Sequence, residues 1–152
     1  MSIVEGYAFE AMVGDPDDHR PDTRWSLVVD PGGPEGRVDG LAVITERIAP
    51  GDRIPLHVHR DDELVIVHGQ GRYRFGDEER DVADGAIVFI PAGVPHGLAN
   101  PTDRALPIEG IFATTRVWMR YLDRNPAPGT EVDAPQRGAT YDFRTGAVTF
   151  DE

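Results

Sequence analysis

The sequence has 152 residues, a length typical of one domain with a hydrophobic core. It contains no cysteine, and all 15 basic residues are arginine, which excludes thiol nucleophiles, disulfides, iron–sulfur clusters and lysine Schiff bases. The formal net charge of −12 and the lack of an arginine-rich run argue against nucleic acid and anionic membranes as partners. We therefore expect no nucleic acid or membrane partner, and a cytoplasmic location because the N-terminal residues lack a signal-peptide pattern.

The 13 prolines and 17 glycines are spread along the chain and predict short strands joined by tight turns. In chain order, strands are expected at residues 24–30, 41–49, the segment of His57 and His59, 63–67, 72–75, 78–82, 86–90, 96–100 and 104–113. Their regular recurrence predicts a closed or two-sheet antiparallel barrel over about residues 24–113.

The two ends of the chain are expected to lie outside this barrel. Residues 1–23 form an N-terminal arm that contains an acidic loop, in which His19 is expected to be exposed. After the barrel, one short helix is predicted from Thr115 to Arg124, because its apolar residues are spaced as on one helix face. The tail that completes residues 114–152 ends in a predicted strand or hairpin at residues 141–150.

Four polar residues of the central segment predict a metal site. His57 and His59 are two residues apart in a predicted strand and therefore point to the same face, and Glu63 keeps this parity. His96 arrives from another predicted strand. Three imidazoles and one carboxylate favour a divalent transition metal over calcium or magnesium, which prefer oxygen ligands.

At these residues the sequence resembles the cupin superfamily. The first cupin motif, G-x5-H-x-H-x(3,4)-E-x6-G, matches from Gly51 through Glu63 and then departs, because only five residues separate Glu63 from Gly69. The irregularity indicates a tighter turn or a role for Gly71. The second motif, G-x5-P-x-G-x2-H-x3-N, matches in full from Gly85 to Asn100.

The resemblance to small metal-binding cupins implies an all-β fold, an RmlC-like jelly-roll barrel of the type 2 conserved kind, with residues 1–152 as one domain. It implies that His57, His59, Glu63 and His96 are the metal ligands, and that the cofactor is one divalent ion of Fe, Mn, Ni, Cu, Co or Zn. It also implies a small-molecule ligand in the barrel and a homodimer.

Other residues are weighed as parts of the pocket. Tyr73 and Glu109 are the pocket candidates, Tyr73 through its hydroxyl and Glu109 as a carboxylate in an apolar strand, although a core aromatic and an exterior carboxylate are the simpler interpretations. His68 has the parity opposite to Glu63 and should point outward unless a bulge reverses it. Trp25 and Arg47 are further candidates for the pocket wall.

Three functions from different classes remain open. The first is a metal-dependent oxygenase of the quercetinase-like kind, which the resemblance supplies. The second is redox-neutral metal-assisted chemistry by an isomerase, cyclase or lyase, and the third is a non-catalytic protein that binds a metal or metabolite. Metal identity would separate the first two.

Overall fold

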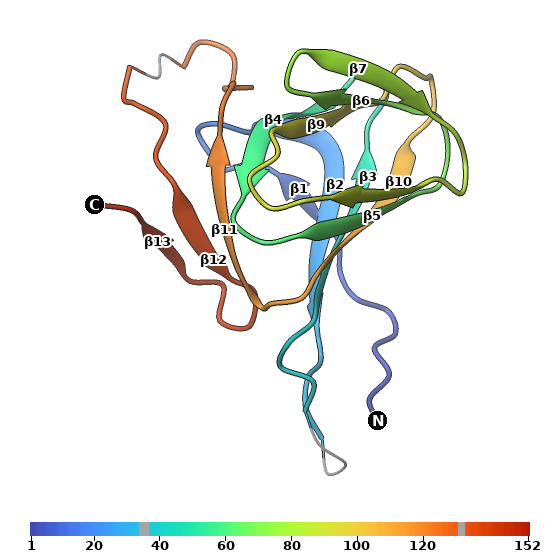
Figure 1. Ribbon diagram of the computed structural model, residues 1–152, viewed down its shortest axis with the longest axis vertical. Helices are drawn as coiled ribbons and strands as arrows, with labels where there is room; N and C mark the ends of the chain where they lie inside the picture. Colours follow the sequence, from blue (N-terminus) through green and yellow to red (C-terminus); the bar gives the residue numbers. More distant parts are fainter. Residues whose placement is uncertain (34–36, 131–132) are drawn as a thin grey trace.

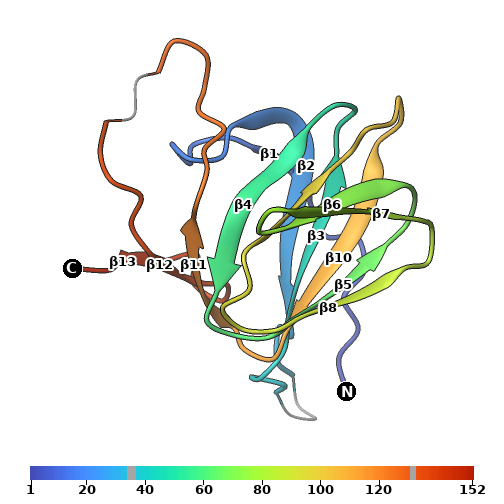
Figure 2. The ribbon, with the colours of Figure 1, turned by 45° about the horizontal axis from the view of Figure 1, so that its top comes forward.

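All regular elements of the described chain are β-strands, in a computed structural model that describes residues 1–33, 37–130 and 133–152. They form two sheets in which all strand pairs are antiparallel (Figures 1 and 2). The six-stranded sheet consists, in spatial order, of β1 (Glu10–Met12), β2 (Arg20–Val29), β3 (Ala42–Ile48), β10 (Leu106–Phe112), β5 (Glu63–Val67) and β8 (Ile87–Ile90). The seven-stranded sheet consists of β13 (Val148–Phe150), β12 (Ala139–Asp142), β11 (Arg116–Tyr121), β4 (Arg53–His59), β9 (His96–Ala99), β6 (Gly71–Phe75) and β7 (Glu78–Val82).

The chain crosses repeatedly between the two sheets. β10 lies between β3 and β5, and β9 lies between β4 and β6, so strands distant in the sequence are hydrogen-bonded neighbours. Buried and partly buried residues alternate along β10 and β5, as expected for strands with one face toward the interior. The all-β, two-sheet architecture predicted from the sequence is therefore confirmed.

The hydrophobic core lies between the sheets and is built from β-branched, leucine and aromatic side chains. Its buried members are Ile48, Val65, Val67, Tyr73, Ile90, Leu98, Leu106 and Ile108. The segment in which the first motif departs from the cupin spacing, at Gly69 and Gly71, packs beside this core. A Cβ atom on Gly69 would lie 2.9 Å from Leu106 Cδ1, and one on Gly71 would lie 2.9 Å from Leu98 Cδ1. Both glycines are therefore closely packed against core leucines.

The helix predicted from Thr115 to Arg124 is wrong. This segment contains β11, which pairs with β4 on one side and β12 on the other. Val117 and Tyr121 are buried and point inward with strand parity, while Trp118 lies on the other face. A short apolar pattern fits both the 3.6-residue period of a helix and the two-residue period of a strand. The strand is favoured here because pairing with β4 satisfies backbone groups at the edge of that strand.

Strands outside residues 24–113 complete both sheets. β1 and the first residues of β2 extend the six-stranded sheet, and the hairpin of β12 and β13 extends the other sheet outward, as Figure 1 shows in red at the left. No helix in the described part of the chain is long and apolar enough to cross a lipid bilayer.

Candidate metal centre

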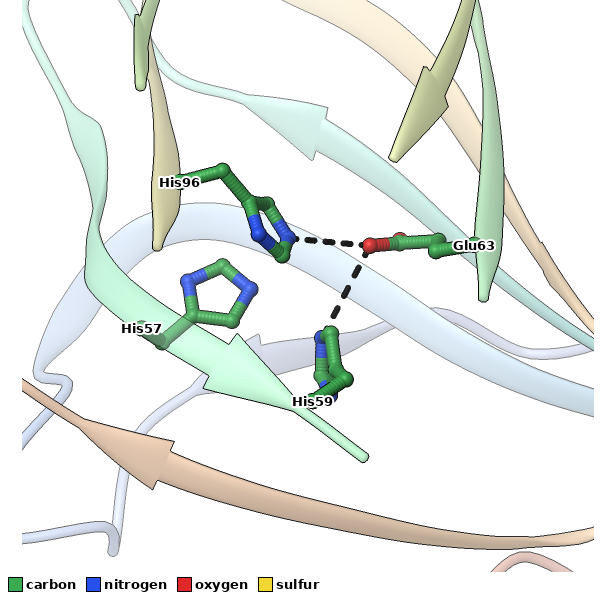
Figure 3. Close-up of side chains that lie close together, drawn as sticks. All are labelled: His57, His59, Glu63 and His96. Carbon is green, nitrogen blue, oxygen red and sulfur yellow. Dashed lines mark hydrogen bonds and ion pairs between the residues drawn. The ribbon is translucent and has the colours of Figure 1, made fainter. Parts of the chain in front are cut away.

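Four buried side chains converge between the two sheets (Figure 3). His57 and His59 project inward from β4, Glu63 is the first residue of β5, and His96 is the first residue of β9. The ligand atoms of these four residues all lie within 4.8 Å of one another. The strand parity that suggested the cluster in the sequence thus holds in the structure.

Each of the three imidazole rings is anchored by its Nδ1 atom to a backbone carbonyl. His57 Nδ1 lies 2.8 Å from Pro55 O, His96 Nδ1 lies 2.8 Å from Val94 O, and His59 Nδ1 lies 3.1 Å from Trp118 O. A carbonyl only accepts, so Nδ1 carries the proton and donates it. In a neutral ring the lone pair is then on Nε2, the arrangement that metal-binding histidines adopt.

The Nε2 atoms of two rings face the Glu63 carboxylate. Glu63 Oε2 lies 3.0 Å from His96 Nε2 and 3.7 Å from His59 Nε2. Two ligands bound at right angles at about 2.1 Å from one metal ion would be about 3 Å apart. The donor set and its spacing therefore fit a single divalent transition metal held by these four side chains.

The environment keeps two of the histidines neutral. Burial, together with the neighbouring His96 and His59, holds the pKa of His57 well below its ordinary value. Burial also lowers the pKa of His59, although the nearby Glu63 carboxylate partly opposes this effect. Neutral imidazoles at physiological pH offer their lone pairs to a metal without first losing a proton.

Gly110 of β10 makes room for the carboxylate. A Cβ atom at this position would lie 2.7 Å from Glu63 Oε1 and 2.8 Å from Ile44 Cγ2. A larger residue in the middle of β10 would displace Glu63 from the three rings. The glycine is thus required by close approach of a side chain, in a strand where glycine is otherwise unfavourable.

The second-motif residue Asn100 has a structural role. Its side chain is 1% exposed, and Nδ2 donates to the carbonyls of Ile48, Ala49 and Arg104 at 2.9, 3.2 and 2.7 Å. These bonds join the end of β9 to the end of β3, and Asn100 does not reach the metal cluster.

The four residues lie on the wall of a cavity of about 200 Å³ between the sheets. Tyr73 and Trp25, two of the residues considered for the pocket from the sequence, also line it. Burial and the nearby Glu63 and Glu46 carboxylates raise the pKa of Tyr73, so its hydroxyl keeps its proton and can donate a hydrogen bond.

The other candidates lie elsewhere. Glu109 points to the outer face of β10, where it is hydrogen-bonded to the exposed ring of His68. Arg47 stacks over the Phe9 ring with 4.2 Å between its guanidinium carbon and the ring centroid. His19 forms backbone hydrogen bonds with Asn125. None of the four lines the cavity.

Sequence reasoning missed a buried ionic group on the same cavity wall, formed by Asp18, Arg20 and Glu46, with Tyr121 beside it. The acidic, proline-containing sequence around Asp18 and Arg20 gives no sign that these two side chains are buried. The available signal was Glu46, a carboxylate in a strand whose residues before it are apolar or β-branched.

The segment that matches a known protein family contains all four residues of the metal cluster. Residues 44–109 match the family profile of the cupin domain. The HTH-type transcriptional activator RhaS of Mannheimia succiniciproducens is 38% identical to the chain over 82 residues, which are 53% of this chain and 30% of that protein. The chain thus matches less than a third of this relative's length.

Solved structures share the fold. A sugar phosphate isomerase from a cupin superfamily, from Silicibacter pomeroyi, has a TM-score of 0.64 and 19% identity over 95% of this chain and 87% of its own. The polyketide cyclase RemF from Streptomyces resistomycificus has a TM-score of 0.61 and 20% identity over 89% of each chain. Oxalate decarboxylase from Bacillus subtilis has a TM-score of 0.55 and 21% identity, over 71% of this chain and 27% of its own.

Proposed function

We propose that this protein, which contains a cupin-type domain, is an enzyme that binds one divalent transition metal and acts on a small organic molecule in the adjoining cavity. The proposed ligands are His57, His59, Glu63 and His96. The observation that carries the proposal is that three rings, each anchored through Nδ1, and one carboxylate bring their ligand atoms within 4.8 Å of one another at a cavity wall. Such a set leaves two positions of an octahedral ion for the ligand.

When bound, the metal would supply Lewis-acid polarisation of a ligand oxygen and, if redox-active, oxygen chemistry. The residues of the chain would do the rest. The backbone carbonyls hold the rings in place, Tyr73 lines the same cavity, and much of the remaining wall is apolar. Apolar side chains would pack against the carbon skeleton of a bound molecule.

Two reaction classes fit this site. Oxygenase chemistry of the quercetinase-like kind is proposed first, on the resemblance of the ligand motif. Redox-neutral chemistry is the second candidate, because proteins of the same fold are named an isomerase, a cyclase and a decarboxylase. The same ligand set can serve both reaction classes, so the identity of the bound metal distinguishes them. Iron, copper, nickel or manganese supports the oxygenase, and zinc supports the redox-neutral enzyme.

The proposal is tested by measuring bound metal in protein produced under metal-replete conditions, with plasma mass spectrometry. About one metal ion per chain is expected in the wild type and a small fraction of this in His57→Ala. His68→Ala is the matched control, because His68 lies on the outer face and is expected to change nothing. Equal metal content in wild type and His57→Ala, or no metal in either, would contradict the proposal.

A further inference from the structure

A buried ionic group lies on the cavity wall apart from the metal cluster. The Arg20 side chain is 1% exposed, and its Nε and Nη2 atoms donate to the two carboxylate oxygens of Asp18, each at 2.7 Å. Its Nη1 atom donates to Glu46 Oε2 at 2.9 Å. The Tyr121 hydroxyl lies 3.4 Å from Asp18 Oδ2. The guanidinium is therefore shared between two carboxyl groups, and all three of its nitrogen atoms already donate to them rather than to a ligand.

Carboxyl groups outnumber cationic side chains along the cavity, and burial raises the pKa of two of them, Asp15 and Glu46. Among the described lining residues, Arg20 is the one guanidinium or ammonium group, whereas the carboxyl groups are those of Asp15, Asp18, Glu46 and Glu63. An anionic group in the cavity would be desolvated beside carboxylates without a free cation to pair with, which is costly in a buried site.

Uncharged hydrogen bonding is nevertheless available. The Tyr73 side chain is 2% exposed and lines the cavity, and in the described part of the chain its hydroxyl has no hydrogen-bond partner. A phenol hydroxyl can both donate and accept a hydrogen bond, so this group suits a polar atom of a bound molecule. Much of the remaining wall is apolar, including Trp25, Leu27, Ile44, Ile108 and Phe112.

We infer that the cavity selects a largely apolar molecule that carries no charge beyond the oxygen atoms that meet the metal, and that it rejects anions such as phosphate esters and sulfonates. The inference rests on the proposed function, because the ligand is taken to meet the metal. It differs from that proposal in naming the charge of the substrate. Selection arises from Asp18 and Glu46, which together occupy Arg20.

The test compares catechol with catechol 4-sulfonate, which share the chelating oxygens and differ by one permanent negative charge. Each is titrated into the zinc-loaded protein by calorimetry, and the affinities are referred to those for free zinc in the same buffer. Relative to free zinc, we expect the protein to bind the sulfonate at least tenfold more weakly than catechol.

A substitution tests the assigned cause. Glu46→Gln keeps a side-chain oxygen for Arg20 but replaces the carboxyl group with a neutral amide, so the discrimination against the sulfonate should shrink several-fold. Glu109→Gln makes the same change on the outer face and should leave the discrimination unchanged. An unchanged discrimination in Glu46→Gln would refute the role of that carboxylate.

The two proposals can fail separately because zinc content is measured on the same samples. Equal relative binding of the two probes, or binding of neither, in protein that retains its zinc overturns the inference and leaves the metal site standing. Failure to retain zinc overturns the metal site and the inference together. The comparison in the wild type stands alone if Glu46→Gln does not fold.

Discussion

His57 and His96 face each other across the pairing of β4 with β9, with ring centroids 4.2 Å apart, and each is anchored to the carbonyl two residues earlier in the chain. The acceptors are Pro55 for His57 and Val94 for His96. Because each acceptor is part of the local backbone, the protonated nitrogen of each ring is chosen before any metal arrives. The four side chains are therefore preorganised, which would reduce the cost of ordering them around the proposed metal.

Gly110→Ala should weaken metal binding. The new Cβ atom would lie 2.7 Å from Glu63 Oε1 and 2.8 Å from Ile44 Cγ2, so the carboxylate must move away from the rings. Loss of one well-placed ligand is expected to reduce zinc affinity by about 10- to 100-fold, and the overpacking should destabilise the fold by about 1–3 kcal/mol.

Zinc affinity of this variant is measured by competition with a chelator, and stability by thermal unfolding of the metal-free protein. Gly40→Ala is the control, because a Cβ atom at Gly40 meets no atom within 4 Å. Wild-type zinc affinity in Gly110→Ala would show that Glu63 does not depend on the space beside Gly110.

Tyr73→Phe should weaken binding of catechol to the zinc-loaded protein and leave its zinc content unchanged. The substitution removes one hydroxyl from the cavity and preserves the ring that stacks on Phe75. One hydrogen bond to a neutral group contributes about 0.5–1.5 kcal/mol, so the affinity should fall by about two- to tenfold. Tyr7→Phe, at an exposed tyrosine, serves as the control in the same calorimetric titration.

Stability of the metal-free protein should fall as the pH drops below about 6.5. Unfolded histidines titrate near this value, whereas burial lowers the pKa of His57 and His59 in the folded state. Below pH 6.5 the unfolded chain therefore binds more protons than the folded protein. Each histidine contributes at most about 1.4 kcal/mol per pH unit, and its contribution is constant above that pH.

This pH dependence is measured by urea unfolding at a series of pH values. Because other carboxyl groups also titrate, the informative quantity is the difference between variants. His57→Gln should reduce the slope below pH 6.5, and His68→Gln, on the outer face, should not. Equal slopes in wild type and His57→Gln would rule out a depressed pKa for His57.

Arg20→Met should destabilise the protein strongly. It leaves the buried carboxylates of Asp18 and Glu46 without their shared cation, and removing one partner of a buried ion pair costs about 3–5 kcal/mol. Arg72→Met removes an exposed pair with Asp81 and should have little effect. Urea unfolding at neutral pH compares the two, and similar losses in both would contradict a stabilising role of the buried group.

Local pattern accounts for what could be predicted of the metal cluster. The parity of His57 and His59 depends only on strand geometry, and His96 follows the turn at Gly93, whose φ of 79° suits glycine. The outward direction of His68 follows from the same parity. These features depend only on neighbouring residues, so the sequence is enough to predict the direction of these side chains.

The segment from Arg116 to Tyr121 shows why local pattern was insufficient elsewhere. Its apolar spacing fits a helix as well as a strand, and the unpaired edge of β4 selected the strand. The result matters for the site, because β11 supplies the Trp118 carbonyl that anchors His59 and the Tyr121 side chain on the cavity wall. A backbone edge that needs a partner is visible only when both sheets are assembled.

What the sequence by itself determined is most of the β-strands and the grouping of His57, His59, Glu63 and His96, since the strands follow from local periods and the grouping from strand parity together with the two cupin-like motifs. Only the tertiary structure decided the ionic group of Asp18, Arg20 and Glu46, because Arg20 and Glu46 are 26 residues apart and meet across β2 and β3. The sign and strength of such an interaction depend on burial. Burial is a property of the packed sheets and cannot be read from the charge of a loop.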